Sequence, residues 1–330
     1  MRPDRFWRAV GFSAAALLMA AVACPLIGST TLDYRRAFAG ASPDHEILFY
    51  VRLPRVALAL VAGGTLATTG VLFQAILREP LAEPYTLGIS SGSSLGAVLA
   101  ICFGWHSALG LPATWLCAFA GAVVTLALVL LIALERRRMS SFTLLLAGVS
   151  INSIAMASIL FLHNVATFSQ SFAITRWLMG GVDAVPLRVI AGLAAVTLPV
   201  CAAIFARSRD WNLLAVGEEW AVVRGLRASR MLVAGYIAGS IMTGSVTAFT
   251  GPIGFIGLIV PHALRIAVGA DHRILIPCSF LLGAAFLAVC DTLARTVLAP
   301  TEIPVGVLTA LLGGPFFIWL LKSGRRSLWL

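Results

Sequence analysis

The sequence predicts an all-α integral membrane protein with about ten transmembrane helices, and two observations carry this prediction. Of the 330 residues, 59% are hydrophobic and 12% are charged, whereas a soluble domain has a charged share of roughly 25%. The apolar residues also form charge-free runs, several of which reach the roughly 20 residues that a helix needs to cross a bilayer. We therefore expect a single transmembrane domain over residues 1–330.

The apolar runs give the expected position of each span. The charge-free run 87–134 is long enough to turn back on itself near Trp105, Gly110 and Pro112, so it holds two spans. The run 254–268 is short and contains glycines and a proline, which suits a half-helix as well as a full span. The expected spans are 9–31, 56–77, 87–104, 112–134, 142–163, 188–206, 231–250, 254–268, 274–298 and 304–321.

The first apolar run follows Arg2, Arg5 and Arg8, as the apolar part of a signal peptide would. The run is longer than such a segment, and no clear small-x-small cleavage site follows it. We therefore expect a retained first helix.

Basic residues set the expected orientation. If the N-terminus is cytoplasmic, 17 of the 24 Lys and Arg residues lie on the cytoplasmic side, among them Arg136, Arg137 and Arg138. This satisfies the positive-inside rule and predicts a bacterial inner-membrane protein with both termini in the cytoplasm. Because the basic residues are spread over short loops, the net charge of +10 indicates topology rather than nucleic-acid binding. The seven on the outer side are Arg35, Arg36, Arg52, Arg55, Arg176, Arg188 and Arg295.

Several kinds of chemistry lack the residues that they need. The only lysine is Lys322, so a P-loop for ATP hydrolysis is excluded. The H-E-x-x-H motif is also absent from the sequence, and we expect no enzyme activity in this chain. The six cysteines and five histidines are dispersed, so we expect no metal site and no cofactor.

Asp291 is the acid that falls inside an expected span. Arg295 follows it by four residues, which favours an ion pair near the helix end; a proton relay is the alternative. Almost all other acids lie in expected loops, whereas proton-coupled transporters usually carry acids in mid-membrane. A secondary transporter is therefore the less favoured class for this protein, although it stays an alternative.

The longest cytoplasmic connection, about 208–228, is expected to form two short helices. Asp210 suits the cap of the first helix and Gly217 its end, while Gly225 suits the end of the second. Glu218 and Glu219 suit the positive N-terminus of the second helix. The connection holds more apolar side chains than a solvated linker needs, which favours docking onto a soluble partner. The alternative is an interfacial helix on lipid headgroups.

Eight motifs in a fixed order resemble the FecCD-type permeases, which belong to ATP-binding-cassette (ABC) importers of iron chelates and vitamin B12. The match runs from Arg52 to Lys322. One departure is Glu79, where the family commonly has Asn. The motifs are R-L-P-R (52–55), G-G-T-L-A-T-T-G-V-L-F-Q (63–74), P-L-A-E-P-Y-T-L-G-I-S-S-G (80–92), L-L-L-A-G-V (144–149), W-L-M-G-G (177–181), L-A-V-G-E-E (214–219), G-P-I-G-F-I-G-L-I-V-P-H (251–262) and I-P-V-G-V-L-T-A-L-L-G-G-P-F-F-I-W-L-L (303–321).

The resemblance implies the type II ABC importer permease fold with an inverted repeat. It also implies partners: a second permease subunit in a homodimer, two ATPase subunits that hydrolyse ATP, a periplasmic substrate-binding protein and membrane lipid. The implied function is alternating-access import of an iron chelate, either a siderophore or haem. Cobalamin is the alternative substrate. The preference for iron chelates rests on how common such members are in the family, and no residue of this chain supports it.

The resemblance further assigns roles to residues. ATPase coupling is implied for Leu214, Gly217, Glu218, Glu219 and Arg224. Docking of the binding protein is implied for Arg52, Arg55 and Arg295, which as an alternative would be membrane anchors. A cytoplasmic gate is implied for Ser140 and Ser141, which as an alternative would form a tight turn. The expected translocation path is lined by uncharged polar residues, with Ser150, Asn152 and Ser153 as candidates.

Overall fold

The computed structural model describes residues 3–85, 87–108, 110–135 and 140–322, so Arg136, Arg137 and Arg138 lie outside the described residues. The described residues are almost entirely helical. The elements are α1 (Pro3–Leu26), α2 (Tyr34–Phe38), α3 (Asp44–Glu46), a π-helix (Ile47–Arg52), α4 (Leu53–Leu77), α5 (Ile89–Cys102), β1 (Ser107–Ala108), β2 (Leu111–Pro112), α6 (Ala113–Glu135), α7 (Ser141–Val165), α8 (Phe168–Leu178), α9 (Leu187–Ala206), α10 (Ser208–Val216), α11 (Glu218–Val223), α12 (Ala228–Thr250), α13 (Ile256–Val268), α14 (His272–Thr296) and α15 (Val305–Lys322).

Each of the ten expected spans coincides with one apolar helix. Among the described residues, seven helices are long and apolar enough to cross a membrane, and three shorter apolar helices, α5, α13 and α15, accompany them. The run 254–268, which suited a half-helix as well as a full span, is α13, whose 13 residues span only about 20 Å. The chain is thus a multi-pass membrane protein.

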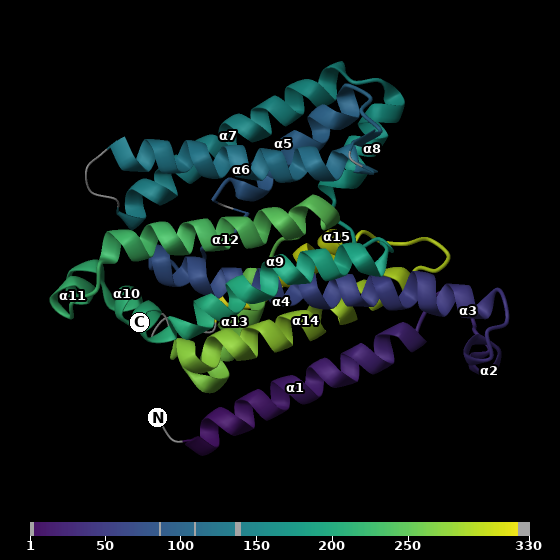
Figure 1. Cartoon of the computed structure of the whole chain (residues 1–330), viewed down its shortest axis with the longest axis horizontal. Helices are drawn as coiled ribbons and strands as arrows, with labels where there is room; N and C mark the ends of the chain where they lie inside the picture. Colours follow the sequence, from purple (N-terminus) through teal and green to yellow (C-terminus); the bar gives the residue numbers. More distant parts are fainter. Residues whose placement is uncertain (1–2, 86, 109, 136–139, 323–330) are drawn as a thin grey trace.

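The helices pack in layers (Figure 1). Helices α5, α6 and α7 form one group, α12 lies against α6 and α4, and α14 packs along α4. Helix α1 lies on the outside of the bundle against α14. Short helices mark the two ends: we call the end with α10 and α11 the α11 end, and the end with α2 and α3 the α2 end.

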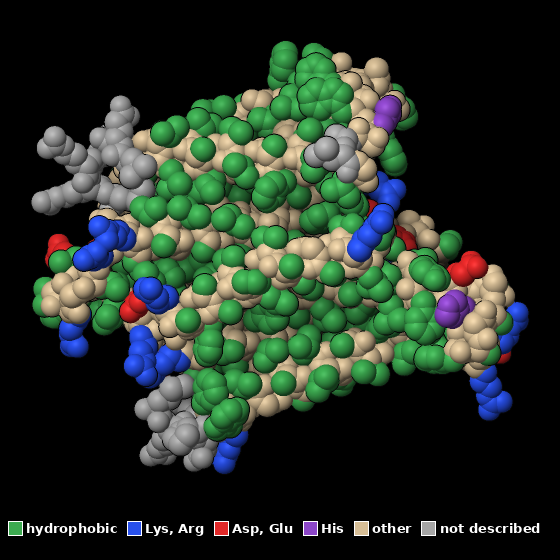
Figure 2. All heavy atoms as spheres, viewed as in Figure 1, with side chains coloured by type: hydrophobic (Ala, Val, Ile, Leu, Met, Phe, Trp, Pro, Cys, Tyr) green, Lys and Arg blue, Asp and Glu red, His purple; other side chains and the backbone are tan. Residues whose placement is uncertain are grey.

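The surface agrees with a membrane environment. Figure 2 shows hydrophobic side chains over the long flank of the bundle, with most basic and acidic side chains near the two ends. Inside the bundle, close helix contacts rest on glycines. A Cβ atom at position 63 would overlap the backbone of Gly283, and one at position 70 would overlap the backbone of Gly257. Helix α4 therefore contacts α13 and α14 almost backbone to backbone, as membrane helices often do.

Candidate functional site

The 208–228 connection forms two short helices beyond the span α9, as the sequence predicts. Helix α10 packs on α4 and α14, with Leu214 fully buried. The Trp211 indole donates a 2.9 Å hydrogen bond to the carbonyl of Ile204 at the end of α9. The predicted cap was wrong: the N-cap of α10 is Arg207, and Asp210 lies in the first turn. The reason is that α10 follows α9 almost without a break, so the helix starts before Asp210.

The outer side of this helix pair is apolar and exposed. Its four members are between 58% and 78% exposed, and they lie at the α11 end, beyond the long apolar helices. Burying them against a partner would be favourable, because exposed contiguous apolar groups mark interaction sites. We call this set the α11 patch; it consists of Val216, Trp220, Val222 and Val223.

The inner side of the pair binds α7 through one carboxylate. Glu218 Oε1 accepts hydrogen bonds from the backbone N–H of Ser141 at 3.2 Å and lies 2.7 Å from its hydroxyl. That hydroxyl also lies 2.6 Å from the Ile76 carbonyl, and its single proton serves one acceptor at a time. Arg78 completes the contact with an ion pair of 3.5 Å.

This contact joins residues that the sequence treats separately. Ser141 is the first residue of α7 and Ser140 is its N-cap, accepting a hydrogen bond from Thr143 N at 3.2 Å. The Glu218 carboxylate therefore lies at the positive end of the α7 dipole. The expected gate residues Ser140 and Ser141 and the expected coupling residue Glu218 therefore lie in one site. Arg78 also belongs to this site, although the sequence did not indicate it. Glu219 and Arg224 are solvent-exposed on α11 and just after it.

A second polar contact ties α10 to the start of α14. The Asn212 side chain donates to Asp271 Oδ1 at 2.9 Å and accepts from His272 N at 2.9 Å. Asp271 is the N-cap of α14 and also pairs with the Arg273 guanidinium at 2.7 Å. The hydrogen bonds from Arg273 hold the pKa of the Asp271 carboxyl well below its usual range.

Asp271→Asn is expected to destabilise the protein by about 1 to 2 kcal/mol at neutral pH, because the ion pair and the charged cap are lost. A lowered folded-state pKa means that this contribution is present above the unfolded pKa of about 3.9 and is lost as pH falls through the folded value. Thermal unfolding of purified protein from pH 7 to pH 3 measures it. The difference in stability between wild type and Asp271→Asn should be smaller at pH 3 than at pH 7. Asp183→Asn, in an exposed 4.0 Å pair with Arg176, is the control and should change little.

An ion cluster lies at the opposite, α2 end. Arg55 binds Asp291 with nitrogen–oxygen distances of 3.0 to 3.2 Å and Glu302 at 2.9 Å. The predicted pair between Asp291 and Arg295 is present at 3.8 Å, although Arg55 is the nearer partner. The Asp291 side chain is only 1% exposed. A carboxylate so deeply buried depends on these pairs.

The other two predicted docking arginines fasten the end of α1. Arg295 donates to the carbonyl of Cys24 at 2.6 Å, and Arg52 donates to the carbonyl of Thr30 at 2.5 Å. Both residues are 4% exposed, whereas Arg55 lies nearer the surface. At the same end, four further arginines are solvent-exposed: Arg35, Arg36, Arg176 and Arg188.

The candidate path residues lie on α7. Ser150 and Ser153 are exposed on the surface of the single chain, and each hydroxyl donates to a carbonyl four residues earlier. Asn152 is half-buried, with its Oδ1 enclosed and without a hydrogen-bond partner in the described structure. A path lined by these residues would therefore run along the outside of one subunit.

Two acids of the loop before α5 have structural roles that the sequence analysis did not assign. Glu83 is 8% exposed and accepts a 3.0 Å hydrogen bond from the backbone N–H of Phe255, directly before α13. Its charge suits the positive N-terminus of that half-helix. The available signal was an acid between Pro80 and Pro84 before a charge-free run. Glu79, the departure from the family pattern, accepts from Leu81 N at 3.2 Å and closes a local turn.

Comparisons with known proteins agree over almost the whole chain. The profile of the FecCD transport family matches residues 14–323. The chain is 36% identical over 323 residues to the hemin transport system permease protein HmuU of Yersinia pestis, with 96% of each chain covered. It is 41% identical over 290 residues to the vitamin B12 import system permease protein BtuC of Escherichia coli, with 86% of each covered. A solved structure described as an inward-facing metal-chelate type ABC transporter superposes with a TM-score of 0.84 at 30% identity, covering 96% of this chain and 99% of that one.

Proposed function

The chain belongs to the FecCD transport family, and from this premise we propose that it works as the permease of an ABC importer driven by separate ATPase subunits. The observation that carries the proposal is the α11 patch. Four exposed apolar side chains lie beyond the membrane-spanning helices, on short helices whose inner side is fastened to α7 and α14. A lipid-facing role would not need those polar links to two spans.

The orientation follows from this proposal. ATPase subunits are cytoplasmic, so the α11 end faces the cytoplasm and the α2 end faces the periplasm. Arg207, Arg209, Arg224, Arg227 and Arg230 lie around α10 and α11, as the positive-inside rule requires of a cytoplasmic surface. The location is then the bacterial inner membrane, with both termini in the cytoplasm.

The contacts suggest how ATP binding moves the spans. Closure of the ATPase subunits displaces α10 and α11, which are linked to α7 through Glu218 and to α14 through Asn212. Both helices run the full thickness of the bundle, so a shift at the α11 end reaches the α2 end. One arrangement of the helices is inward-open and the other outward-open, and nucleotide changes their populations.

A second copy of the chain completes the path. Ser150 and Ser153 expose hydroxyls among apolar neighbours of α7 such as Leu146 and Ile154. Polar groups on a membrane-facing helix surface are expected to face protein or a water-filled space rather than lipid. We place α7 at the homodimer interface, where these side chains line the transport path.

The α2 end is the proposed docking surface for the periplasmic binding protein. Arg55 is the member of the predicted set near the surface, and its exposed partner Glu302 is an acid for which a carboxylate of the binding protein can substitute. Arg52 and Arg295 contribute by holding α1 and the cluster in position. Exposed arginines around them supply attraction over longer range.

We propose an iron chelate as substrate and favour haem, because the match to the hemin permease spans 96% of both chains. Cobalamin is the second candidate, since a vitamin B12 permease is 41% identical. Proteoliposomes with this chain, its ATPase and its binding protein test the proposal. ATP-dependent uptake of haem should exceed cobalamin uptake by at least about tenfold, a difference of about 1.4 kcal/mol. Cobalamin uptake alone would correct the substrate, and failure to accumulate either with ATP would contradict the importer.

A further inference from the structure

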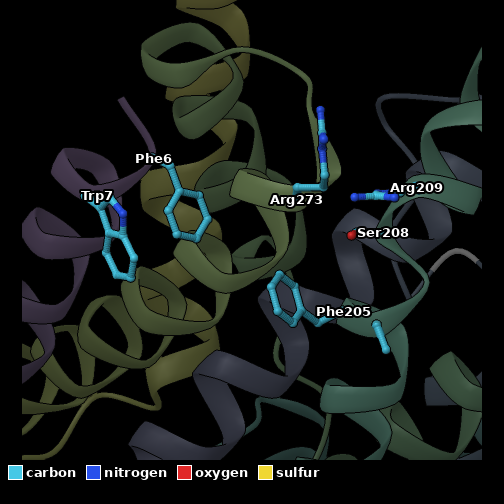
Figure 3. A pocket seen from close by; sticks show the side chains of 7 residues that line it. Phe6, Trp7, Phe205, Ser208, Arg209 and Arg273 are labelled. Carbon is cyan, nitrogen blue, oxygen red and sulfur yellow. The ribbon is translucent and has the colours of Figure 1, made fainter. Parts of the chain in front are cut away.

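A pocket at the α11 end is separate from the contact between α11 and α7 and adjoins the contact between α10 and α14 through Arg273. It lies between the start of α1, the junction of α9 and α10, and the start of α14, with a volume of about 610 Å³. Figure 3 shows three aromatic side chains around one part of it and two arginines beside the remaining part. Besides Ala206, the side chains that line it are Phe6, Trp7, Phe205, Ser208, Arg209 and Arg273.

The pocket opens at the level of lipid headgroups. Helix α1 exposes large apolar side chains along its outer face, including Phe12, Leu18 and Met19, so this face contacts hydrocarbon. Trp7 is exposed at the end of the same face. Tryptophan is enriched where hydrocarbon meets headgroups, so the pocket lies at that boundary.

The cationic part of the pocket has unused hydrogen-bond donors. In the part of the chain that the structure describes, Arg209 is exposed and makes no ion pair. Arg273 uses its Nε and Nη2 for Asp271, which leaves Nη1 available. Ser208 is the first residue of α10, so a helix N-terminus adds partial positive charge. The pocket therefore offers cationic donors from α10 and α14, with Asp271 as the neighbouring carboxylate.

We propose that this pocket binds the headgroup of an anionic phospholipid of the cytoplasmic leaflet. The phosphate lies between Arg209 and Arg273, and the glycerol and first acyl carbons lie against Phe6 and Phe205. A soluble anion would not use the aromatic side, and a zwitterionic lipid would bring its own cation to the arginines. Basic pockets between membrane helices on the cytoplasmic side suit such headgroups. The bound lipid would bridge α1, α10 and α14.

Native mass spectrometry of the full chain from nanodiscs tests this without any transport assay. Nanodiscs contain phosphatidylglycerol and phosphatidylcholine in equal amounts, and the measurement counts the lipid retained after detergent extraction. Wild-type protein should retain phosphatidylglycerol in preference to phosphatidylcholine. Arg209→Gln should reduce the amount of phosphatidylglycerol retained about fivefold. This variant leaves the pair between Asp271 and Arg273 intact. Inorganic phosphate in solution should not displace the lipid.

The matched control is Arg207→Gln, which removes an exposed arginine two residues away that pairs with Asp210 outside the pocket. It should retain lipid as wild type does. If Arg207→Gln and Arg209→Gln lose phosphatidylglycerol equally, retention depends on general surface charge and the proposal is overturned. Equal retention of phosphatidylglycerol and phosphatidylcholine by wild type would also overturn it. The measurement is repeated with the ATPase subunits bound. If they displace the lipid, the pocket is a protein interface and the proposal is wrong.

Discussion

Glu218→Lys is expected to reduce ATP-driven uptake by at least about tenfold while the ATPase subunits stay bound. The carboxylate links α11 to the N-terminus of α7 through Ser141 N and its hydroxyl. Hydrogen bonds to a charged group are worth about 1.5 to 3 kcal/mol each, and 1.4 kcal/mol is a factor of about ten. A lysine would also place a cation beside Arg78 and at the positive end of α7.

The measurement compares uptake with ATP hydrolysis in the same proteoliposomes. Hydrolysis should continue in Glu218→Lys, because the α11 patch is unchanged and faces away from this contact. Glu79→Lys is the control, since Glu79 is an exposed acid with the same charge that closes a local turn outside the link between α11 and α7. It should transport as wild type does. Normal coupling of uptake to hydrolysis in Glu218→Lys would show that motion does not pass through the link between α11 and α7.

The double variant Trp220→Asp with Val223→Asp is expected to release the ATPase subunits. These side chains are 65% and 78% exposed and together form the centre of the α11 patch. Buried aromatic residues in interfaces cost about 2 kcal/mol or more when removed, and carboxylates there add a desolvation cost. We expect affinity for the ATPase to fall by at least about thirtyfold. The permease itself should stay folded, because both side chains point away from the bundle.

Co-purification of the ATPase and thermal stability of the permease are measured together. Phe38→Asp is the control, because Phe38 is 70% exposed in α2 at the opposite end. It should retain the ATPase. Retention of the ATPase by the double variant at wild-type affinity would remove the α11 patch from the interface.

Much of the fold was predictable because membrane spans impose a length and an apolar composition. Every expected span became a helix. At 254–268 the glycines and proline left a half-helix and a full span open, and the structure has the short helix α13 there. The 208–228 connection was predictable for a related reason: Gly217 separates two segments of apolar and helix-forming residues. Short elements such as α8 and the π-helix Ile47–Arg52 were not predicted, since each is apolar but too short to form a span.

The sequence could not show which distant residues meet. Asp291 is paired with Arg55, 236 residues away, and Glu218 with Ser141, 77 residues away, because helix packing brings them together. Local spacing reveals only the contact between Asp291 and Arg295. Burial was equally hidden: Arg52 looked like a surface cation, yet its guanidinium binds the carbonyl groups of Leu26, at the end of α1, and of Thr30, just after it. Such pairings depend on tertiary structure rather than on sequence pattern.

Accessibility of a cysteine at position 223 tests the central claim most directly. Val223→Cys is made in a background in which the half-buried Cys102, Cys117 and Cys201 are replaced by serine. A membrane-impermeant maleimide is applied to intact spheroplasts and to inside-out vesicles, with and without the ATPase subunits. Labelling should occur only in inside-out vesicles, and bound ATPase should block it. Labelling from the periplasmic side, or equal labelling with the ATPase bound, would contradict a cytoplasmic coupling surface on α11.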